Sequence, residues 1–229
     1  MTPHTNCLIG QLLPADQSLL IHRCEEVWVE VGNVLLSPQT EEQFVYFLGS
    51  SSVAMVVRSA NGSGLALGLI GPEGAVGLQL GLGMGPGVMT YQAQSSGVAW
   101  RVAAPVLQQL VQKRAALLLA CAKYLWVVSQ EVASMATSAQ TQDIRARLAT
   151  WILLSTARSG PATLMLTQAH LADMLGVRRA SITLAAMELK ARGLLEYRRG
   201  KVFVLDPVGL EAVARTTHGS AVVSAPRAR

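Results

Sequence analysis

A change in the spacing of apolar residues near residue 105 is the feature that most constrains how this chain can fold. Before it, short apolar segments alternate with Gly, Pro, Asn and Ser turns, which is typical of β-strands. After it, apolar residues recur every three or four positions, which predicts helices. The expected strands are residues 27–31, 33–36, 44–48, 53–57, 65–70, 88–94 and 98–102. The sequence therefore predicts an α+β chain that begins with an antiparallel barrel or sandwich of the roll type.

The helical part contains one long apolar seam. Pro105 suits the first position of a short helix over residues 106–113, and another helix is expected over residues 139–157. Between them, apolar residues follow the 3-4-3-4-3 spacing that a two-stranded coiled coil requires, which predicts a dimerisation helix. A buried core helix is the alternative, because Leu117, Leu119 and Trp126 broaden the apolar face. The seam consists of Leu118, Cys121, Leu125, Val128, Val132 and Met135.

Basic residues are concentrated in the second half of the chain. Residues 1–104 hold three Lys or Arg against seven Asp or Glu, whereas residues 105–229 hold sixteen against seven. This asymmetry indicates a polyanionic partner for the second half. Half of all residues are hydrophobic, which excludes disorder for most of the length.

Cysteine usage and the absence of sorting signals indicate a soluble, cytoplasmic protein. Cys7, Cys24 and Cys121 share no metal-ligand spacing and leave one thiol over in any disulfide scheme, so neither a metal nor another cofactor is expected. The first residues lack the pattern of a signal peptide, and the apolar run 115–122 stops at Lys123. No paired carboxylates or Ser/His/Asp set suggests catalysis, so the chain is not expected to be an enzyme.

Two helices and a hairpin follow in the basic half. Thr167 is a good N-cap for a helix over residues 168–175, Gly176 supplies a turn, and a second helix spans residues 178–191. A hairpin over residues 195–204 and a short helix over residues 208–214 complete a winged helix-turn-helix. On the second helix, the outward residues of the first turns, where a recognition helix meets base edges, are Arg178, Arg179, Ser181, Thr183 and Leu184. The tip of the hairpin carries Arg198, Arg199 and Lys201, well placed for phosphate or minor-groove contact.

Residues 166–183, LTQAHLADMLGVRRASIT, closely resemble the helix-turn-helix of the cyclic-AMP receptor protein/fumarate–nitrate regulator (CRP/FNR) family. The wing and the Leu-Asp-Pro at residues 205–207 are similar too, and the order of roll, long helix and winged helix is the family's. The resemblance implies a homodimeric, sequence-specific DNA-binding transcription regulator. Its expected partners are a double-stranded operator and the transcription machinery, such as RNA polymerase.

The resemblance also implies roles for individual residues. Arg179 matches the family arginine that reads a guanine, and Ser181 matches a small hydroxyl residue near the phosphates. Thr167 and Gln168 match the start of the first helix, which contacts the DNA backbone. Two positions depart from the family pattern: Ala180 stands where a glutamate often reads cytosine, and Leu184 where a second arginine can lie, so the family's best-known operator is not expected.

Arg178 replaces the serine that commonly caps the recognition helix. The substitution gives up an N-cap and places a second cation near the phosphates.

The roll lacks the residues by which cyclic-nucleotide-binding relatives hold a phosphate. Those relatives use a Gly-Glu-Leu turn, followed about ten residues later by Arg-Ser/Thr-Ala. The corresponding turn here, and so the candidate effector pocket, is Gly74, Ala75, Val76, Gly77 and Leu78, with alanine in the glutamate slot. Between Arg58 and Arg101 there is no Lys, Arg or His. Because a bound phosphate needs cations or several aligned amides, we expect no control by cyclic AMP.

The expected domains are a roll over residues 1–104, a dimerisation region over 105–138, a winged helix-turn-helix over 139–216 and a flexible tail over 217–229. Two alternatives remain open at this point. The same regulator could be gated by an unidentified small molecule in the roll, or the basic winged domain could bind RNA or another protein. A preference for duplex DNA and a steep salt dependence would favour the regulator.

Overall fold

The computed structural model describes residues 6–41, 43–60, 62–159, 163–198 and 200–216. The chain divides into two compact units. The first unit contains residues up to Val57 and then Gly68–Ser129, and the second contains Arg58–Leu67 and the chain from Gln130 onward. Arg199 and the expected tail over residues 217–229 lie outside the described residues.

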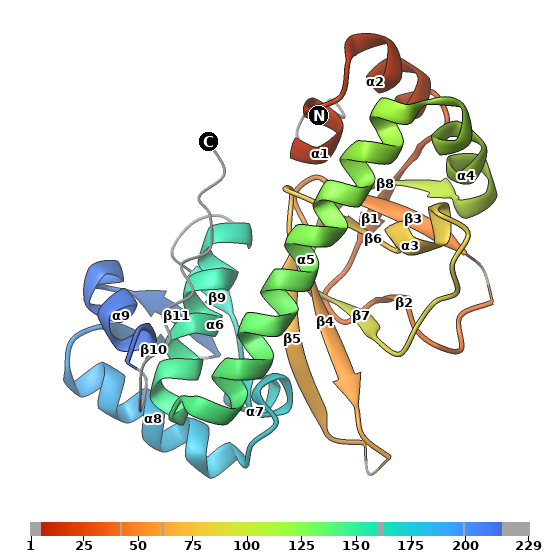
Figure 1. Ribbon diagram of the computed structural model, residues 1–229. Helices are drawn as coiled ribbons and strands as arrows, with labels where there is room; N and C mark the ends of the chain where they lie inside the picture. Colours follow the sequence, from red (N-terminus) through yellow and green to blue (C-terminus); the bar gives the residue numbers. More distant parts are fainter. Residues whose placement is uncertain (1–5, 42, 61, 160–162, 199, 217–229) are drawn as a thin grey trace. The chain divides into compact units, whose positions relative to one another are not determined.

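Two four-stranded antiparallel sheets form the roll, as Figure 1 shows. Their residues lie in the first unit, except Arg58 and residues 64–67, which belong to the second. One sheet has the order β1 (Glu25–Val29), β8 (Gly97–Ala103), β3 (Phe44–Leu48) and β6 (Ala75–Val76). The other has the order β2 (Val34–Leu36), β7 (Thr90–Ser95), β4 (Ser52–Arg58) and β5 (Gly64–Ile70). All seven expected strands are present, and the roll predicted from the sequence is confirmed. Its core includes Val45, Phe47, Leu48, Met55, Leu69 and Leu78.

Four helices of the first unit complete this core. They are α1 (Cys7–Gly10), α2 (Pro14–Ile21), α3 (Leu78–Gly81) and α4 (Ala104–Lys113). Only α4 was expected from the sequence. Asn6 links α1 to the roll, because its side-chain amide nitrogen donates 2.8 Å hydrogen bonds to the carbonyls of Leu48 and Gly74. Its side-chain oxygen accepts a hydrogen bond from the Ile9 N–H. The two carbonyls lie 42 and 68 residues away in the chain.

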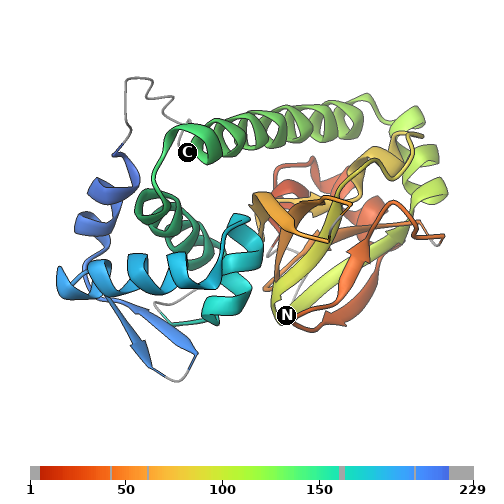
Figure 2. The ribbon, with the colours of Figure 1, turned by 90° about the horizontal axis from the view of Figure 1, so that it is seen from below.

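The long helix α5 (Ala115–Thr141) is uninterrupted (Figure 2). The helix expected over residues 139–157 was wrong at its start, since α5 continues to Thr141 and α6 (Ile144–Ser159) follows after residues 142–143. Asp143 makes the break by accepting a 2.9 Å hydrogen bond from the Ala146 N–H. Partial burial disfavours its charged form, but this bond and the Arg145 guanidinium outweigh it and lower the pKa of Asp143. No Gly or Pro marks this boundary in the sequence.

By length and composition, α5 is also one helix that could span a membrane. The criterion is weak, because core helices of soluble proteins satisfy it too. Leu117 and Cys121 on α5 are buried, and the helix also contains the charged residues Lys123 and Glu131.

The second unit contains helices and a small sheet (Figure 1). After α6 come β9 (Thr163–Met165), α7 (Gln168–Leu175), α8 (Arg179–Ala191), β10 (Leu195–Arg198), β11 (Lys201–Val204) and α9 (Pro207–Ala214). The strands pair antiparallel in the order β10-β11-β9. Arg158 on α6 forms a bidentate ion pair with Glu131, with nitrogen–oxygen distances of 2.8 and 3.0 Å. Fully buried side chains of this core include Leu148, Trp151, Ile152, Leu171, Ile182 and Leu189.

Candidate nucleic-acid interface

Helices α7 and α8 form the expected helix-turn-helix. Thr167 caps α7, because its hydroxyl accepts a 3.2 Å hydrogen bond from the His170 N–H. Gly176 ends the helix in the left-handed conformation with φ of +64°, which glycine adopts at little cost. Arg178 precedes α8 in an extended conformation and makes no side-chain capping bond. Both the cap and the turn were predicted from the sequence.

The first turns of α8 expose most of the residues expected to contact DNA. Arg178, Arg179 and Leu184 are exposed, the last by 62%. Ser181 and Thr183 are half-buried. The Thr183 hydroxyl donates a 2.8 Å hydrogen bond to Oε1 of Gln168, so two of the expected residues are joined across α7 and α8. This bond orients the Gln168 amide and leaves its nitrogen free to donate elsewhere.

The β10–β11 hairpin lies beside α8 in the view of Figure 2, and β10 packs against that helix. A Cβ added at Gly200 would lie 3.7 Å from the Thr167 methyl group, so the wing turn lies next to the N-cap residue. Lys201 is exposed, whereas Arg198 pairs with Glu196 on its own strand at 2.9 Å. The expected wing residue Arg199 lies outside the described residues. The turn of the wing and the start of α7 therefore form one surface that carries Lys201.

Comparison with known proteins decides the family of this domain. Residues 146–213 match the model of the Crp-like helix-turn-helix domain. Residues 146–213 are a Crp-like helix-turn-helix. No curated protein matches the sequence.

Solved structures extend the likeness to the fold of the whole chain. A crp/fnr-family transcriptional regulator from Eubacterium rectale is 19% identical with a TM-score of 0.72, over 91% of this chain and 98% of its own. A CRP-family regulator from Thermus thermophilus is 19% identical with a TM-score of 0.69, over 85% and 100%. The c-di-GMP-responsive regulator CLP from Xanthomonas campestris is 18% identical with a TM-score of 0.66, over 83% and 98%. These likenesses show that the chain shares the fold of these CRP/FNR-family structures.

Two arginines that sequence reasoning missed support this Crp-like domain from α6. Arg147 is half-buried and donates a hydrogen bond to the carbonyl of Leu175, the last residue of α7. Arg145 pairs with Asp143 at 2.6 Å and with Glu188 on α8 at 2.9 Å. The Leu175 carbonyl lies 28 residues from Arg147 and Glu188 lies 43 residues from Arg145, so no local sequence pattern predicts these two contacts.

The expected dimer seam is only partly on the outer face of α5. Leu118 is exposed, and Leu125, Val128, Val132 and Met135 are half-buried. Cys121 is 1% exposed, and burial raises the pKa of its thiol to about 11. Its placement in a dimer seam is not supported, because it packs inside its own chain. A different apolar row with heptad spacing is exposed along α5, and it consists of Leu119, Ala122, Trp126 and Ala133.

The expected effector segment is packed into the core of the first unit. Ala75, Val76 and Leu78 are buried, and a Cβ on Gly74 would overlap the hydroxyl of Tyr124 on α5. A Cβ on Gly77 would lie 2.8 Å from the Phe44 carbonyl oxygen. These residues form a β-strand and the start of α3, so they pack against the protein's own side chains.

Arg101 is the first cation after this segment in the sequence, and it already interacts with other residues. It bonds Glu25 at 2.9 Å and stacks 4.6 Å from the centroid of the Phe44 ring. Among the described residues, no group of three or more His, Cys, Asp or Glu gathers as metal ligands would.

Proposed function

We propose that this protein is a cytoplasmic, homodimeric transcription regulator that binds specific duplex DNA through its winged helix-turn-helix. The observation that carries the proposal is the arrangement of cations around the start of α8. Arg178 and Arg179 are exposed and have no ion-pair partner among the described residues, and Lys201 extends from the wing that lies next to Thr167. A polyanion is the partner that such uncompensated charges favour.

The geometry of α8 assigns these residues different tasks. Arg179 lies on the first turn, from which a guanidinium can donate two hydrogen bonds to a guanine edge in the major groove. Leu184, exposed one turn further on, can contact a thymine methyl group. The uncapped N–H groups at the start of α8 and the Arg178 side chain favour a phosphate there. Gln168 and Ser181 then contribute backbone contacts, which fix the register without reading sequence.

Dimerisation follows from the exposed row on α5. Leu119 and Trp126 are large apolar side chains that are more than half exposed, and they recur with Ala122 and Ala133 at heptad spacing. A second copy of the same helix can cover this row in a coiled coil. The two winged domains of such a dimer would read two half-sites related by a two-fold axis. A regulator of this kind acts through the transcription machinery, such as RNA polymerase, and catalyses no reaction.

Selection of bound duplexes from a random DNA pool tests this function. We expect the recovered sites to be two-fold symmetric, with half-site centres about one helical turn apart. Binding should weaken steeply as salt rises, because cation–phosphate contacts release counterions. An RNA of the recovered sequence is the control. Tighter binding to the RNA, or a pool that stays random, would reject the proposal.

A further inference from the structure

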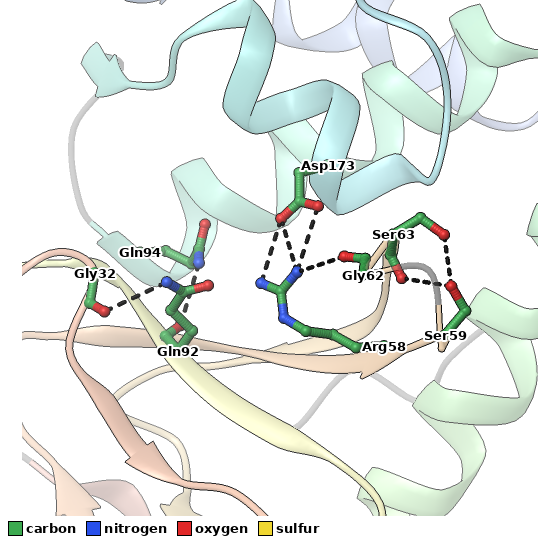
Figure 3. A network of polar contacts seen from close by, with 8 residues as sticks. All are labelled: Gly32, Arg58, Ser59, Gly62, Ser63, Gln92, Gln94 and Asp173. Atoms are coloured by element: carbon green, nitrogen blue, oxygen red, sulfur yellow. Dashed lines mark hydrogen bonds and ion pairs between the residues drawn. The ribbon is translucent and has the colours of Figure 1, made fainter.

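Arg58 is joined to helix α7 by an ion pair that crosses 115 positions of sequence. It lies at the end of β4 and belongs, with residues up to Leu67, to the second unit. Its guanidinium nitrogens approach the two carboxylate oxygens of Asp173 at 3.4 to 3.5 Å, as Figure 3 shows. Each side chain is about two-thirds covered by its surroundings.

The turn that carries Arg58 is held in shape by its own hydrogen bonds. The Ser59 N–H donates to the Ser63 carbonyl at 2.9 Å. Figure 3 shows the Ser59 hydroxyl beside Ser63, whose hydroxyl lies 2.7 Å away. Arg58 also donates to the Gly62 carbonyl at 3.4 Å. The guanidinium is therefore anchored in its own turn as well as by Asp173.

The same turn packs against the loop between α7 and α8. A Cβ on Gly176 would lie 3.2 Å from the Gly64 carbonyl oxygen and 3.6 Å from the Leu65 side chain. Beside this contact is a cleft of about 460 Å³. Its lining includes Ser63 and Gly64 from the turn, and Asp173, Arg178 and Ser181 from the helix-turn-helix. Asp173 therefore shares a surface with residues at the start of the recognition helix.

The negative charge of Asp173 is unfavourable on a surface that binds DNA. It is the one carboxylate between Thr167 and Met187, the segment that holds the whole turn and most of α8. An uncompensated carboxylate there would repel phosphates and compete with them for Arg178. Arg58 supplies the opposite charge at ion-pair distance.

We propose that Arg58 is a positioning residue for DNA binding, which acts by neutralising Asp173 and holding the turn between α7 and α8. The inference rests on the proposed function, because it assumes a DNA partner. It extends the set of residues that determine DNA affinity to a turn more than one hundred positions before the helix-turn-helix. Arg58 makes this contribution through Asp173, without itself contacting DNA.

A double-mutant cycle tests this role on the full-length protein, with the duplex recovered from the random pool as the probe. At low salt, Arg58→Ala should weaken binding about three- to tenfold, because the repulsion from Asp173 is then uncompensated. Asp173→Asn should bind at least as tightly as the unchanged protein. The double variant should match Asp173→Asn within about twofold, since the charge that Arg58 neutralises is gone.

Two further variants separate charge from packing. Arg58→Lys should retain most of the affinity, because it keeps the cation near Asp173. Arg101→Ala, which breaks a comparable arginine–carboxylate pair with Glu25 in the first unit, should leave DNA affinity unchanged. Melting curves of all variants check that each is folded.

Three results would overturn the inference. Arg58→Ala could weaken binding equally in the unchanged protein and in the Asp173→Asn variant. That result would mean that Arg58 contacts DNA or acts elsewhere. Tighter binding by Arg58→Ala would mean that the turn obstructs DNA. A loss of affinity in Arg58→Lys as large as in Arg58→Ala would exclude the charge effect. If the unchanged protein enriches no duplex, the proposed function itself fails, which is a separate outcome measured first.

Discussion

The guanidinium of Arg147 on α6 donates a hydrogen bond to the carbonyl oxygen of Leu175, the last residue of α7. Desolvation lowers the pKa of Arg147, yet an arginine stays charged at any ordinary pH. A cation at the last carbonyls of a helix satisfies an unpaired acceptor and complements the helix dipole. Because Gly176 follows directly, this bond fixes the point from which the chain turns into the recognition helix.

Arg147→Ala should therefore destabilise the winged domain. We expect a loss of about 1–3 kcal/mol, because a partly buried carbonyl loses a charged donor. Unfolding in urea, followed by circular dichroism, measures it. Arg145→Ala is the matched control, since Arg145 lies two positions away on α6 and pairs with Asp143 and Glu188 at the exposed surface. Its loss should be clearly smaller, because exposed ion pairs contribute little. Equal losses of unfolding free energy in the two variants would show that the bond to Leu175 contributes no more than the exposed ion pairs.

Arg179 and Lys201 should affect DNA binding in different ways. Arg179→Ala should weaken specific binding by about 1–3 kcal/mol and relax the choice of one base pair in each half-site. Lys201→Ala should weaken binding about equally on all sequences and reduce the salt slope by roughly one unit. Titrations on a panel of single-base variants of the operator, at several salt concentrations, separate the two effects. An Arg179→Ala protein with unchanged base preference would contradict the assignment.

The exposed row on α5 predicts which substitution would break the proposed dimer. Trp126 is 67% exposed in the single chain, so Trp126→Asp should leave the protomer folded while placing two carboxylates at the interface. Sedimentation equilibrium should then show a monomer. Cys121→Ala is the control, because Cys121 packs inside its own chain and should affect stability without affecting association. If Trp126→Asp stays dimeric while Cys121→Ala dissociates, the interface follows the seam expected from the sequence instead.

Local sequence signals predicted most helices and strands. They could not predict the side-chain contacts between segments that are distant in the sequence. The Thr167 cap, the Gly176 turn and the strand at residues 44–48 depend on neighbouring residues, so their positions could be read directly. The ion pair of Arg58 with Asp173 depends on how distant segments pack, and no spacing encodes it.

The boundary between α5 and α6 was misplaced for a related reason. Asp143 ends one helix and caps the next by a side-chain bond, with no Gly or Pro to mark the site.

The expected dimer seam on α5 is another case in which local spacing was not sufficient. Apolar residues lie all around the first half of α5, because it packs Leu117 and Cys121 inward and also exposes Leu119 and Trp126. Heptad spacing fits both rows, so periodicity alone could not show that Cys121 packs inside the protomer's own core.

The last prediction concerns the roll, which we expect not to respond to cyclic AMP or cyclic GMP. A cyclic nucleotide brings a phosphate charge, and an unpaired charge in a partly buried pocket costs several kcal/mol. Residues 74–78 offer no cation, and Arg101 is held by Glu25 and the Phe44 ring. The hydroxyl of Tyr124 also lies against Gly74, where backbone amides would otherwise have to approach the phosphate.

Calorimetry of the purified protein with millimolar cyclic nucleotide should show no binding heat, and operator affinity should be the same with and without the nucleotide. Tyr124→Ala is an informative companion variant, because it removes the side chain that fills the space at Gly74. It should gain no nucleotide affinity, since the missing cation, rather than the filled space, excludes the phosphate. Micromolar binding by the unchanged protein, or operator binding that requires the nucleotide, would show that backbone amides alone can hold the phosphate in this roll.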